Sequence, residues 1–145
     1  MDNYMCLQVE ALSKNESFAR SVVAAFCVEL NPTLDQINDI KTAVSEAVTN
    51  SIVHGYEGKG GKIEISAYLE GKTVHIEIKD HGVGISDIEK ARQPFFTTKP
   101  EQERSGMGFT VMESFMDTLS VAETDGGGIT VTMSKNLDVN KNQED

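Results

Sequence analysis

Residues 34–54, LDQINDIKTAVSEAVTNSIVH, form the longest segment of this sequence with a helical pattern. Apolar residues recur in it at steps of three and four, which places them in one stripe along a helix. Thr33 can cap this helix at its start, and Gly55 ends it. We therefore expect a long helix with one buried face, made by Ile37, Ile40, Val44, Ala47, Val48, Ser51 and Ile52.

The residues before this helix predict a strand and a first helix. Residues 5–11 alternate loosely between apolar and polar, as a strand does. Ser13 and Glu16 have the spacing of a capping box, so a helix is expected from there to about Leu30. Its inner face is expected to carry Phe18, Val22, Ala25 and Phe26.

The residues after the long helix predict two hairpins separated by a loop and a short helix. Residues 63–69 and 74–78 alternate and form the first hairpin, and residues 119–121 and 129–133 form the second. A helix is expected at about 108–117. This order predicts an α+β fold in two layers, with helices on one face of a mixed, mostly antiparallel sheet. The domain is expected to span residues 1–136, before a polar, disordered tail over 137–145.

Length and charge exclude several classes of protein. The 145 residues fit one domain, and 13 basic against 23 acidic residues give a net charge of −10. A general phosphate-backbone binder carries basic faces, so direct nucleic-acid binding is not expected. Attachment to an anionic membrane is not expected either. The N-terminus lacks a signal peptide and the longest apolar run is residues 22–28, so we expect a cytoplasmic protein.

The two cysteines, Cys6 and Cys27, do not form a Cys-x-x-Cys pair. Both lie in segments with an apolar pattern, which favours buried or partly buried free thiols. A single disulfide is the alternative.

Three polar features are candidates for chemistry, and each also has an ordinary structural explanation. Glu46, Asn50 and His54 follow one another at steps of four, so they share one side of the long helix. Such a row is also what the solvated side of an amphipathic helix looks like. Asp80, with Gly82 and Gly84, follows directly on a predicted strand and allows close approach of a ligand. The same residues are common in plain turns.

The third feature lies before the short helix. Glycines just before a helix expose backbone N–H groups that bind anions, and nearby hydroxyls and cations can hold phosphate oxygens. The alternative is a mobile surface loop. The residues concerned are Thr97, Thr98, Lys99, Arg104, Ser105, Gly106 and Gly108.

Together and in this order, the three features resemble the motifs of the GHKL ATPase superfamily. Glu46-x-x-x-Asn50 resembles its N box, and Asp80-x-Gly82-x-Gly84 resembles its adenine-site box. Phe95 to Lys99 and Gly106-x-Gly108 resemble its lid and phosphate-binding glycines. Over residues 4–135 the chain resembles the anti-sigma serine kinases, through Ser45–Tyr56, Ala91–Pro100 and Glu103–Phe109.

This resemblance implies the Bergerat ATP-binding fold and a role for each motif. Asn50 would hold Mg²⁺, Asp80 the adenine amino group, and Gly82 and Gly84 the close backbone turn. Glu46 would be the general base and Arg104 would stabilise charge on the γ-phosphoryl group. The phosphates of ATP would be wrapped by Thr97, Thr98, Lys99, Ser105, Gly106, Met107, Gly108 and Phe109.

The resemblance also implies a function and partners. The protein would bind and inhibit a sporulation sigma factor and use ATP to phosphorylate a serine of an anti-anti-sigma protein. Arg20 matches the position that touches both partners, although it could be an ordinary exposed helix charge. A homodimer is expected. The alternative function is a nucleotide-gated sigma-binding module with weak or no kinase activity.

The charge is divided unevenly along the chain. Residues 90–104 hold four basic and two acidic residues, so the rest of the chain has a net charge of −12. A nucleotide would therefore meet a locally basic segment, and the acidic remainder could face a basic patch on a sigma factor.

Overall fold

The computed structural model describes residues 1–85, Arg92 and residues 108–138. The helices in this part of the chain are α1 (Lys14–Cys27), α2 (Leu34–Asn50) and α4 (Gly108–Phe115). A short 3₁₀ turn, η1 (Val28–Leu30), follows α1, and a π-helical turn, η2 (Ser51–Gly55), follows α2. The strands are β1 (Asn3–Glu10), β2 (Lys62–Glu70), β3 (Thr73–Lys79), β4 (Thr118–Glu123) and β5 (Ile129–Asn136).

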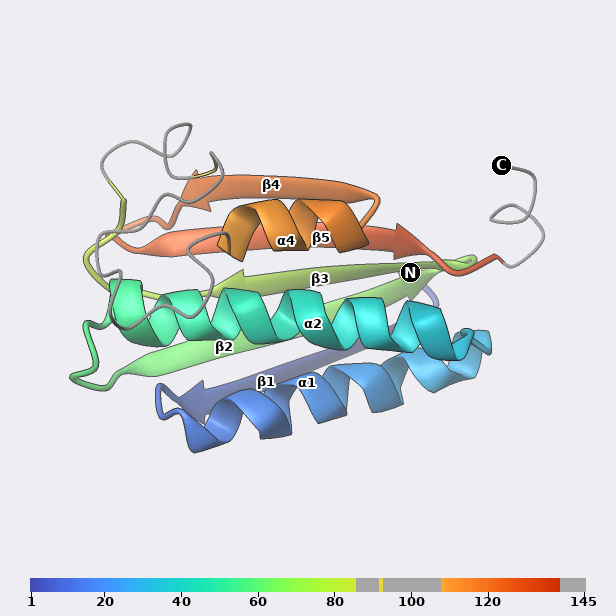
Figure 1. Ribbon diagram of the computed structural model, residues 1–145, viewed down its shortest axis with the longest axis horizontal. Coiled ribbons are helices and arrows are strands. Elements are labelled where there is room, and N and C mark those ends of the chain that lie inside the picture. The colour runs from blue at the N-terminus through green and yellow to red at the C-terminus, as the bar shows by residue number, and fades with distance from the viewer. Residues whose placement is uncertain (86–91, 93–107, 139–145) are drawn as a thin grey trace.

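The strands form one sheet in the order β1-β2-β3-β5-β4. Every pair of neighbouring strands described is antiparallel. The three helices lie on one face of this sheet, with α2 between α1 and α4 (Figure 1). The predicted α+β two-layer fold is confirmed, and among the described strands the sheet contains no parallel pair.

The core lies between the two layers. In β2 and β3 every second residue is buried, and the register sets Ile65 opposite Ile78 and Ala67 opposite Ile76. These residues meet the stripe of α2, in which Ile40, Val44 and Val48 are fully buried. The predicted stripe is therefore the inner face of α2, although Ile37 is only partly buried.

The capping prediction is confirmed for the second helix and wrong for the first. Thr33 accepts a hydrogen bond from the Gln36 N–H, and the Gln36 side chain accepts one from the Thr33 N–H. Ser13 makes no capping hydrogen bond because its backbone is itself helical, at φ −53° and ψ −35°. The Glu16 carboxylate instead pairs with Arg20.

The buried face of α1 lies one residue further along than predicted. Ala19, Val23 and Cys27 are buried, whereas Phe18 is 52% exposed. The prediction that both cysteines are at least partly buried is wrong for Cys6, which is exposed on β1, an edge strand. Both thiols are free.

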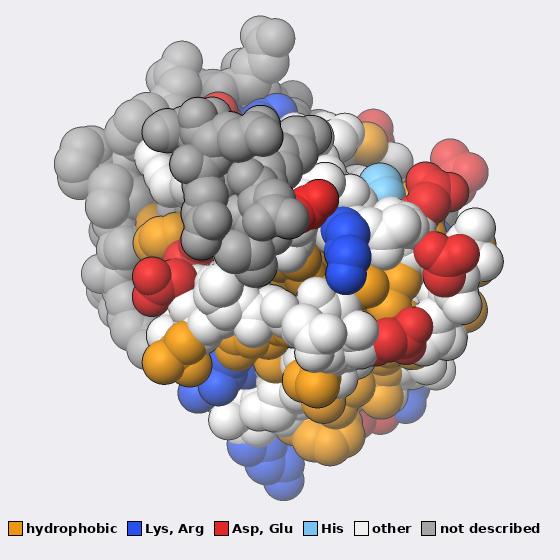
Figure 2. Space-filling view, turned by 90° about the vertical axis from the view of Figure 1, so that its right-hand side faces the viewer, with side chains coloured by type: hydrophobic (Ala, Val, Ile, Leu, Met, Phe, Trp, Pro, Cys, Tyr) orange, Lys and Arg blue, Asp and Glu red, His pale blue; other side chains and the backbone are white. Residues whose placement is uncertain are grey.

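The end of the molecule that carries the turn between α1 and α2 is shown in Figure 2. Hydrophobic side chains gather over its lower part, and acidic side chains stand on one side of it. Val28 and Leu34, which flank this turn, are 60% and 76% exposed. In the described part of the chain, no helix has the length and apolar character needed to cross a membrane.

The chain continues in order past β5 for two residues. Leu137 is buried, and its N–H donates to the Lys72 carbonyl oxygen at 2.7 Å. The predicted tail from residue 137 onward otherwise lies outside the described residues.

Candidate functional site

Several elements end or begin at one end of the sheet. The C-terminal ends of α2 and β3, the start of β5 and the N-terminus of α4 all lie on the same side of the molecule (Figure 1). This arrangement follows from the antiparallel topology, which brings the end of β3 beside the start of β5. Asn50 at the end of α2 and Asp80 after β3, which belong to two of the three polar features of the sequence, therefore both lie at this end.

Asp80 follows β3 directly and is almost fully buried, with 2% of its surface exposed. Its Oδ1 accepts hydrogen bonds from the N–H groups of Gly82 (3.0 Å) and Ile129 (3.1 Å). Its Oδ2 accepts one from the Ser51 hydroxyl at 2.8 Å. A carboxylate can accept about four hydrogen bonds, so these three fix its orientation and leave one acceptor position on Oδ2.

Two glycines allow the backbone segments around Asp80 to touch. A Cβ atom on Gly82 would lie 2.0 Å from the Gly55 carbonyl oxygen, and one on Gly128 would lie 2.1 Å from the Asp80 carbonyl oxygen. The Gly55 carbonyl oxygen also accepts a hydrogen bond from the Val83 N–H at 2.8 Å. Side chains at these positions would push apart the end of η2, the loop after β3 and the start of β5.

Gly55 lies directly against the Asp80 carboxylate. A Cβ atom there would lie 3.0 Å from Oδ2 of Asp80, which is the oxygen with the remaining acceptor position, so a side chain at this residue would crowd it. A hydrogen-bond donor such as an amine is the kind of group that this position accepts. We call the region made of Ser51–Gly55, Asp80–Gly84 and the start of β5 the Asp80 end. It has the chemistry needed to recognise a hydrogen-bond donor on a ligand.

Ser51 is a functional residue whose role the sequence analysis missed. It was assigned to the apolar stripe of the long helix, and it is indeed buried, at 5% exposure. Its hydroxyl, however, donates to Asp80, 29 residues further along the chain. The available signal was a hydroxyl in an otherwise apolar stripe, since buried polar groups are as a rule hydrogen-bonded.

Glu46 and Asn50 lie on the last two turns of α2, and both are partly buried. Glu46 lines a pocket of about 390 Å³ between α1 and α2. The same pocket contains Arg20 of α1, so the structure brings the predicted base and the predicted partner-binding residue together. The remaining lining residues are Glu16, Asn38, Lys41, Thr42, Ser45 and Thr49.

Arg20 is held in place within this pocket. Its Nη1 lies 3.0 Å from Oε1 of Glu16 and donates a longer hydrogen bond, 3.3 Å, to the Ser45 hydroxyl. Its side chain is 36% exposed, so the guanidinium retains N–H groups that a partner can reach. Arg20 is thus more than a free charge on the outer side of α1.

The predicted phosphate-binding residues are described only in part. Gly108 is the buried first residue of α4, and Phe109 after it is 6% exposed. Gly84, in the loop after β3, has a positive φ of 77°. The other predicted residues of this group, Thr97, Thr98, Lys99, Arg104, Ser105, Gly106 and Met107, lie outside the described residues.

Two further observations concern metals and thiols in the part of the chain that is described. There, no cluster of three or more His, Cys, Asp or Glu side chains has the arrangement of a metal site. Burial raises the pKa of the Cys27 thiol to about 12, so this cysteine is protonated and unreactive at neutral pH.

Comparison with known proteins gives one consistent result. Residues 9–135 match the family described as histidine kinase-like ATPase domain. The chain is 58% identical over 142 residues to the anti-sigma F factor of Anoxybacillus flavithermus, and 55% identical over 142 residues to that of Bacillus subtilis. Each alignment covers 97% of both chains.

The fold itself is also found in a solved structure. The catalytic domain of the histidine kinase ThkA matches with a TM-score of 0.57 and 18% sequence identity, over 90% of this chain and 97% of that one. At this level of identity the likeness concerns the fold alone. It supports the two-layer arrangement that places Asp80 and the end of α2 side by side.

Proposed function

Because the chain belongs to the anti-sigma F factors, within the histidine kinase-like ATPase family, we propose that it binds and inhibits a sporulation sigma factor. We further propose that it uses ATP to phosphorylate a serine of an anti-anti-sigma protein. The sequence motifs agree with this function, since the three polar features occur in the order that the resemblance requires.

The Asp80 end supports binding of the adenine group of ATP. The buried carboxylate is held by three hydrogen bonds and keeps one acceptor position on Oδ2, the oxygen beside Gly55. The exocyclic amine of adenine is a donor that fits this position. Gly82 and Gly84 would let the loop after β3 pass close to the base, and Gly108 and Phe109 at the start of α4 would meet the phosphates.

Asn50 is suited to hold Mg²⁺. Its side-chain oxygen is a hard ligand, and it is the last residue of α2, next to Ser51, which contacts Asp80. Mg²⁺ uses few protein ligands and keeps several waters, so a single amide side chain with the phosphates of the nucleotide is sufficient. The ion would neutralise charge on the phosphates of ATP.

The observation that best supports kinase activity is the pocket shared by Glu46 and Arg20. A partner that binds Arg20 would bring its own residues next to Glu46. The Glu46 carboxylate could then accept the proton of a serine hydroxyl, as a general base does. Phosphoryl transfer depends mainly on positioning and on electrostatic stabilisation, to which Lys99 and Arg104 would add positive charge.

The decisive experiment incubates the protein with labelled ATP and a purified anti-anti-sigma protein. Label on a serine of that protein is expected. ATP-dependent complex formation without label would instead indicate the alternative, a nucleotide-gated sigma-binding module. Complex formation with the sigma factor in the same preparation is the control for a folded protein.

Other parts of the proposal remain predictions. A homodimer and wrapping of the phosphates by residues 97–109 come from the resemblance. A cytoplasmic location and a polar tail without a fixed structure come from the sequence, and such a tail can begin only after Leu137, which is buried and donates to the Lys72 carbonyl oxygen. A direct role in nucleic-acid or membrane binding is not proposed, because the net charge of −10 opposes both.

A further inference from the structure

We propose that Tyr56 is a positioning residue for the adenine site: its hydroxyl fixes the loop that carries Asp80. This inference rests on the proposed function, because it takes Asp80 as the residue that recognises adenine. Tyr56 belongs to none of the three polar features of the sequence. Its role follows from contacts that only the folded chain makes.

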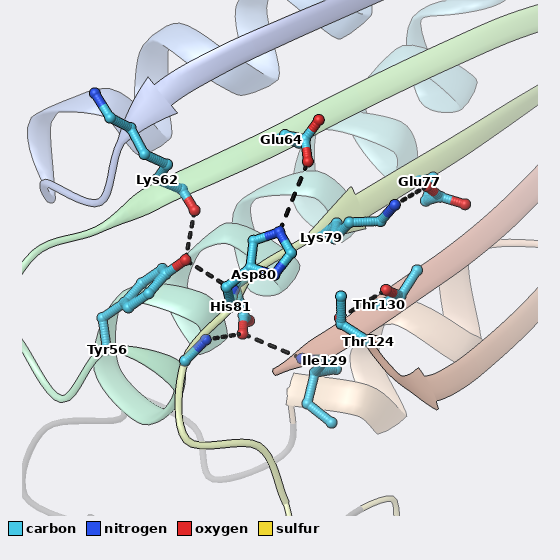
Figure 3. A network of polar contacts seen from close by, with 11 residues as sticks. Tyr56, Lys62, Glu64, Glu77, Lys79, Asp80, His81, Thr124, Ile129 and Thr130 are labelled. Carbon is cyan, nitrogen blue, oxygen red and sulfur yellow. Dashed lines mark hydrogen bonds and ion pairs between the residues drawn. The ribbon is translucent and has the colours of Figure 1, made fainter. Parts of the chain in front are cut away.

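The Tyr56 hydroxyl joins two segments that are far apart in the sequence. It donates a hydrogen bond to the Lys62 carbonyl oxygen at 2.5 Å and accepts one from the His81 N–H at 2.8 Å. Lys62 begins β2, and His81 is the residue directly after Asp80. Figure 3 shows the hydroxyl between these two groups, with Asp80 behind His81.

The ring of Tyr56 is also fixed in place. A Cβ atom on Gly61 would lie 2.4 Å from the ring, so the ring lies directly over the backbone at that residue. Only glycine leaves room for this contact. The backbone N–H of Tyr56 donates to the Ser51 carbonyl oxygen at 2.9 Å, which ties the residue to the first residue of η2.

Tyr56 and the η2 turn that it follows together hold the chain around Asp80. On one side, η2 contains Ser51, whose hydroxyl donates to Oδ2 of Asp80, and Gly55, whose carbonyl oxygen accepts from the Val83 N–H. On the other side, the Tyr56 hydroxyl holds the His81 N–H. The loop from Asp80 to Val83 is thus attached to the turn after α2 at both of its ends.

The side chain of His81 does not replace this attachment. Its Nε2 lies 3.9 Å from the Glu64 carboxylate, and both side chains are about half exposed, so the pair contributes little. Without the Tyr56 hydroxyl, the His81 N–H would have to bond to water. The Asp80 loop would then sample other positions, and the remaining acceptor position of Oδ2 would be less well aimed.

The test uses two nucleotides that differ at the group Asp80 would recognise. ADP carries the exocyclic amine, whereas IDP has a carbonyl oxygen at that position. Binding of both is measured by calorimetry for the unmodified protein and for Tyr56→Phe, which keeps the ring and removes the hydroxyl. We expect the preference for ADP over IDP to fall about five- to tenfold, mostly through weaker ADP binding.

Two further variants make the result interpretable. Tyr68→Phe removes a hydroxyl from a tyrosine that stacks on His75 elsewhere in β2 and β3, and it should leave the preference unchanged. Asp80→Asn tests the proposed adenine contact itself and should abolish most of the preference. Thermal unfolding of each variant shows that it is folded at the temperature of the binding experiment.

The outcomes separate the two proposals. If Asp80→Asn reduces the preference and Tyr56→Phe does not, the role of Tyr56 is overturned while the adenine site stands. Equal losses of ADP and IDP affinity in Tyr56→Phe would also overturn it, since they indicate a purely structural residue. If Asp80→Asn leaves the preference intact, the proposed adenine contact fails.

Discussion

The Asp80 end and the Arg20–Glu46 pocket are built in opposite ways. Around Asp80 the contacts are buried and largely made by backbone, and Gly82 and Gly128 leave no room for a side chain. The pocket between α1 and α2 is lined by polar and charged side chains that are partly exposed. One region is fixed by buried backbone packing, whereas the other is defined by partly exposed side chains, which can exchange their present hydrogen bonds for contacts with a partner.

This difference suits the two tasks that we propose. The adenine ring of a nucleotide is rigid, so a pre-organised site can bind it with little further ordering of the protein. Two protein partners differ in shape, so one surface that meets both of them needs adjustable side chains. The comparison predicts that small changes near Asp80 act on nucleotide binding, and that changes in the pocket act on transfer and on partner binding.

The largest effect is expected in the pocket, from Glu46→Ala. This variant should bind ATP normally and transfer phosphate about 10²–10⁴-fold more slowly, because it lacks the general base. Transfer is measured in single-turnover experiments with labelled ATP. Glu29→Ala, at the far end of the helix pair, is the matched control. A transfer rate near that of the unmodified protein would exclude Glu46 as the base.

The rigidity of the Asp80 end is tested by Gly82→Ala. The added Cβ would meet the Gly55 carbonyl oxygen, so the backbone must move at a cost of about 1–3 kcal/mol. We expect at least tenfold weaker ADP binding together with a lower Tm. The control is Gly126→Ala, since a Cβ there meets no atom within 4 Å and only the backbone at φ +86° is strained. Equal behaviour of the two variants would contradict a packed site.

Asn50→Ala tests whether Asn50 acts on the metal ion or on the adenine ring of the nucleotide. We expect nucleotide affinity to lose its dependence on Mg²⁺, while the preference for ADP over IDP remains. A titration with Mg²⁺ at fixed nucleotide concentration measures this. An unchanged Mg²⁺ dependence would refute the ligand assignment.

A smaller effect is expected from Arg20→Ala. Arginines at interfaces commonly contribute more than 1 kcal/mol, so partner binding should weaken about tenfold. Nucleotide affinity should stay the same, because the pocket and the Asp80 end are separate. A pull-down of each partner tests this, with Lys14→Ala on the same helix as the control. If Arg20→Ala captured both partners as well as the unmodified protein does, Arg20 would be an ordinary exposed charge on α1.

The smallest effect concerns Cys27, which lies in the core away from both regions. In the folded state the pKa of its thiol is raised to about 12 from 9.0, so only the unfolded chain loses this proton between those two values. Stability should therefore fall as pH rises above 9. At neutral pH a thiol reagent should label Cys6 in the folded protein and both cysteines in urea. Labelling of Cys27 without denaturant would show that the reagent reaches the core of the folded protein, and would contradict the burial of this thiol.

The individual helices and strands were mostly predicted correctly from the sequence. The stripe of α2, both hairpins and the Thr33 cap depend on residues close together in the chain, where periodicity and local hydrogen bonds decide. Ser13 was predicted wrongly because a capping box also requires an extended backbone at the cap, and a helical turn precedes α1 here. The inner face of α1 lies one residue further along than predicted, because the way this helix packs on the rest of the fold is not encoded in its own periodicity.

The residues of the candidate site were also predicted only in part. Glu46, Asn50, Asp80 and Gly82 were found because each belongs to a spacing pattern. The contacts of Ser51 and Tyr56 were not predicted, since their partners are 29 and 25 residues away and no local pattern identifies those partners.

The sequence by itself determined the elements, the two-layer class and the family, because these follow from local periodicity and from motifs in a fixed order. Only the tertiary structure decided that Ser51 holds Asp80, that Tyr56 holds the neighbouring His81, and that Arg20 shares a pocket with Glu46. The physical reason is distance along the chain. Hydrogen bonds and pockets form between groups that folding brings together, and their geometry is absent from any short stretch of sequence.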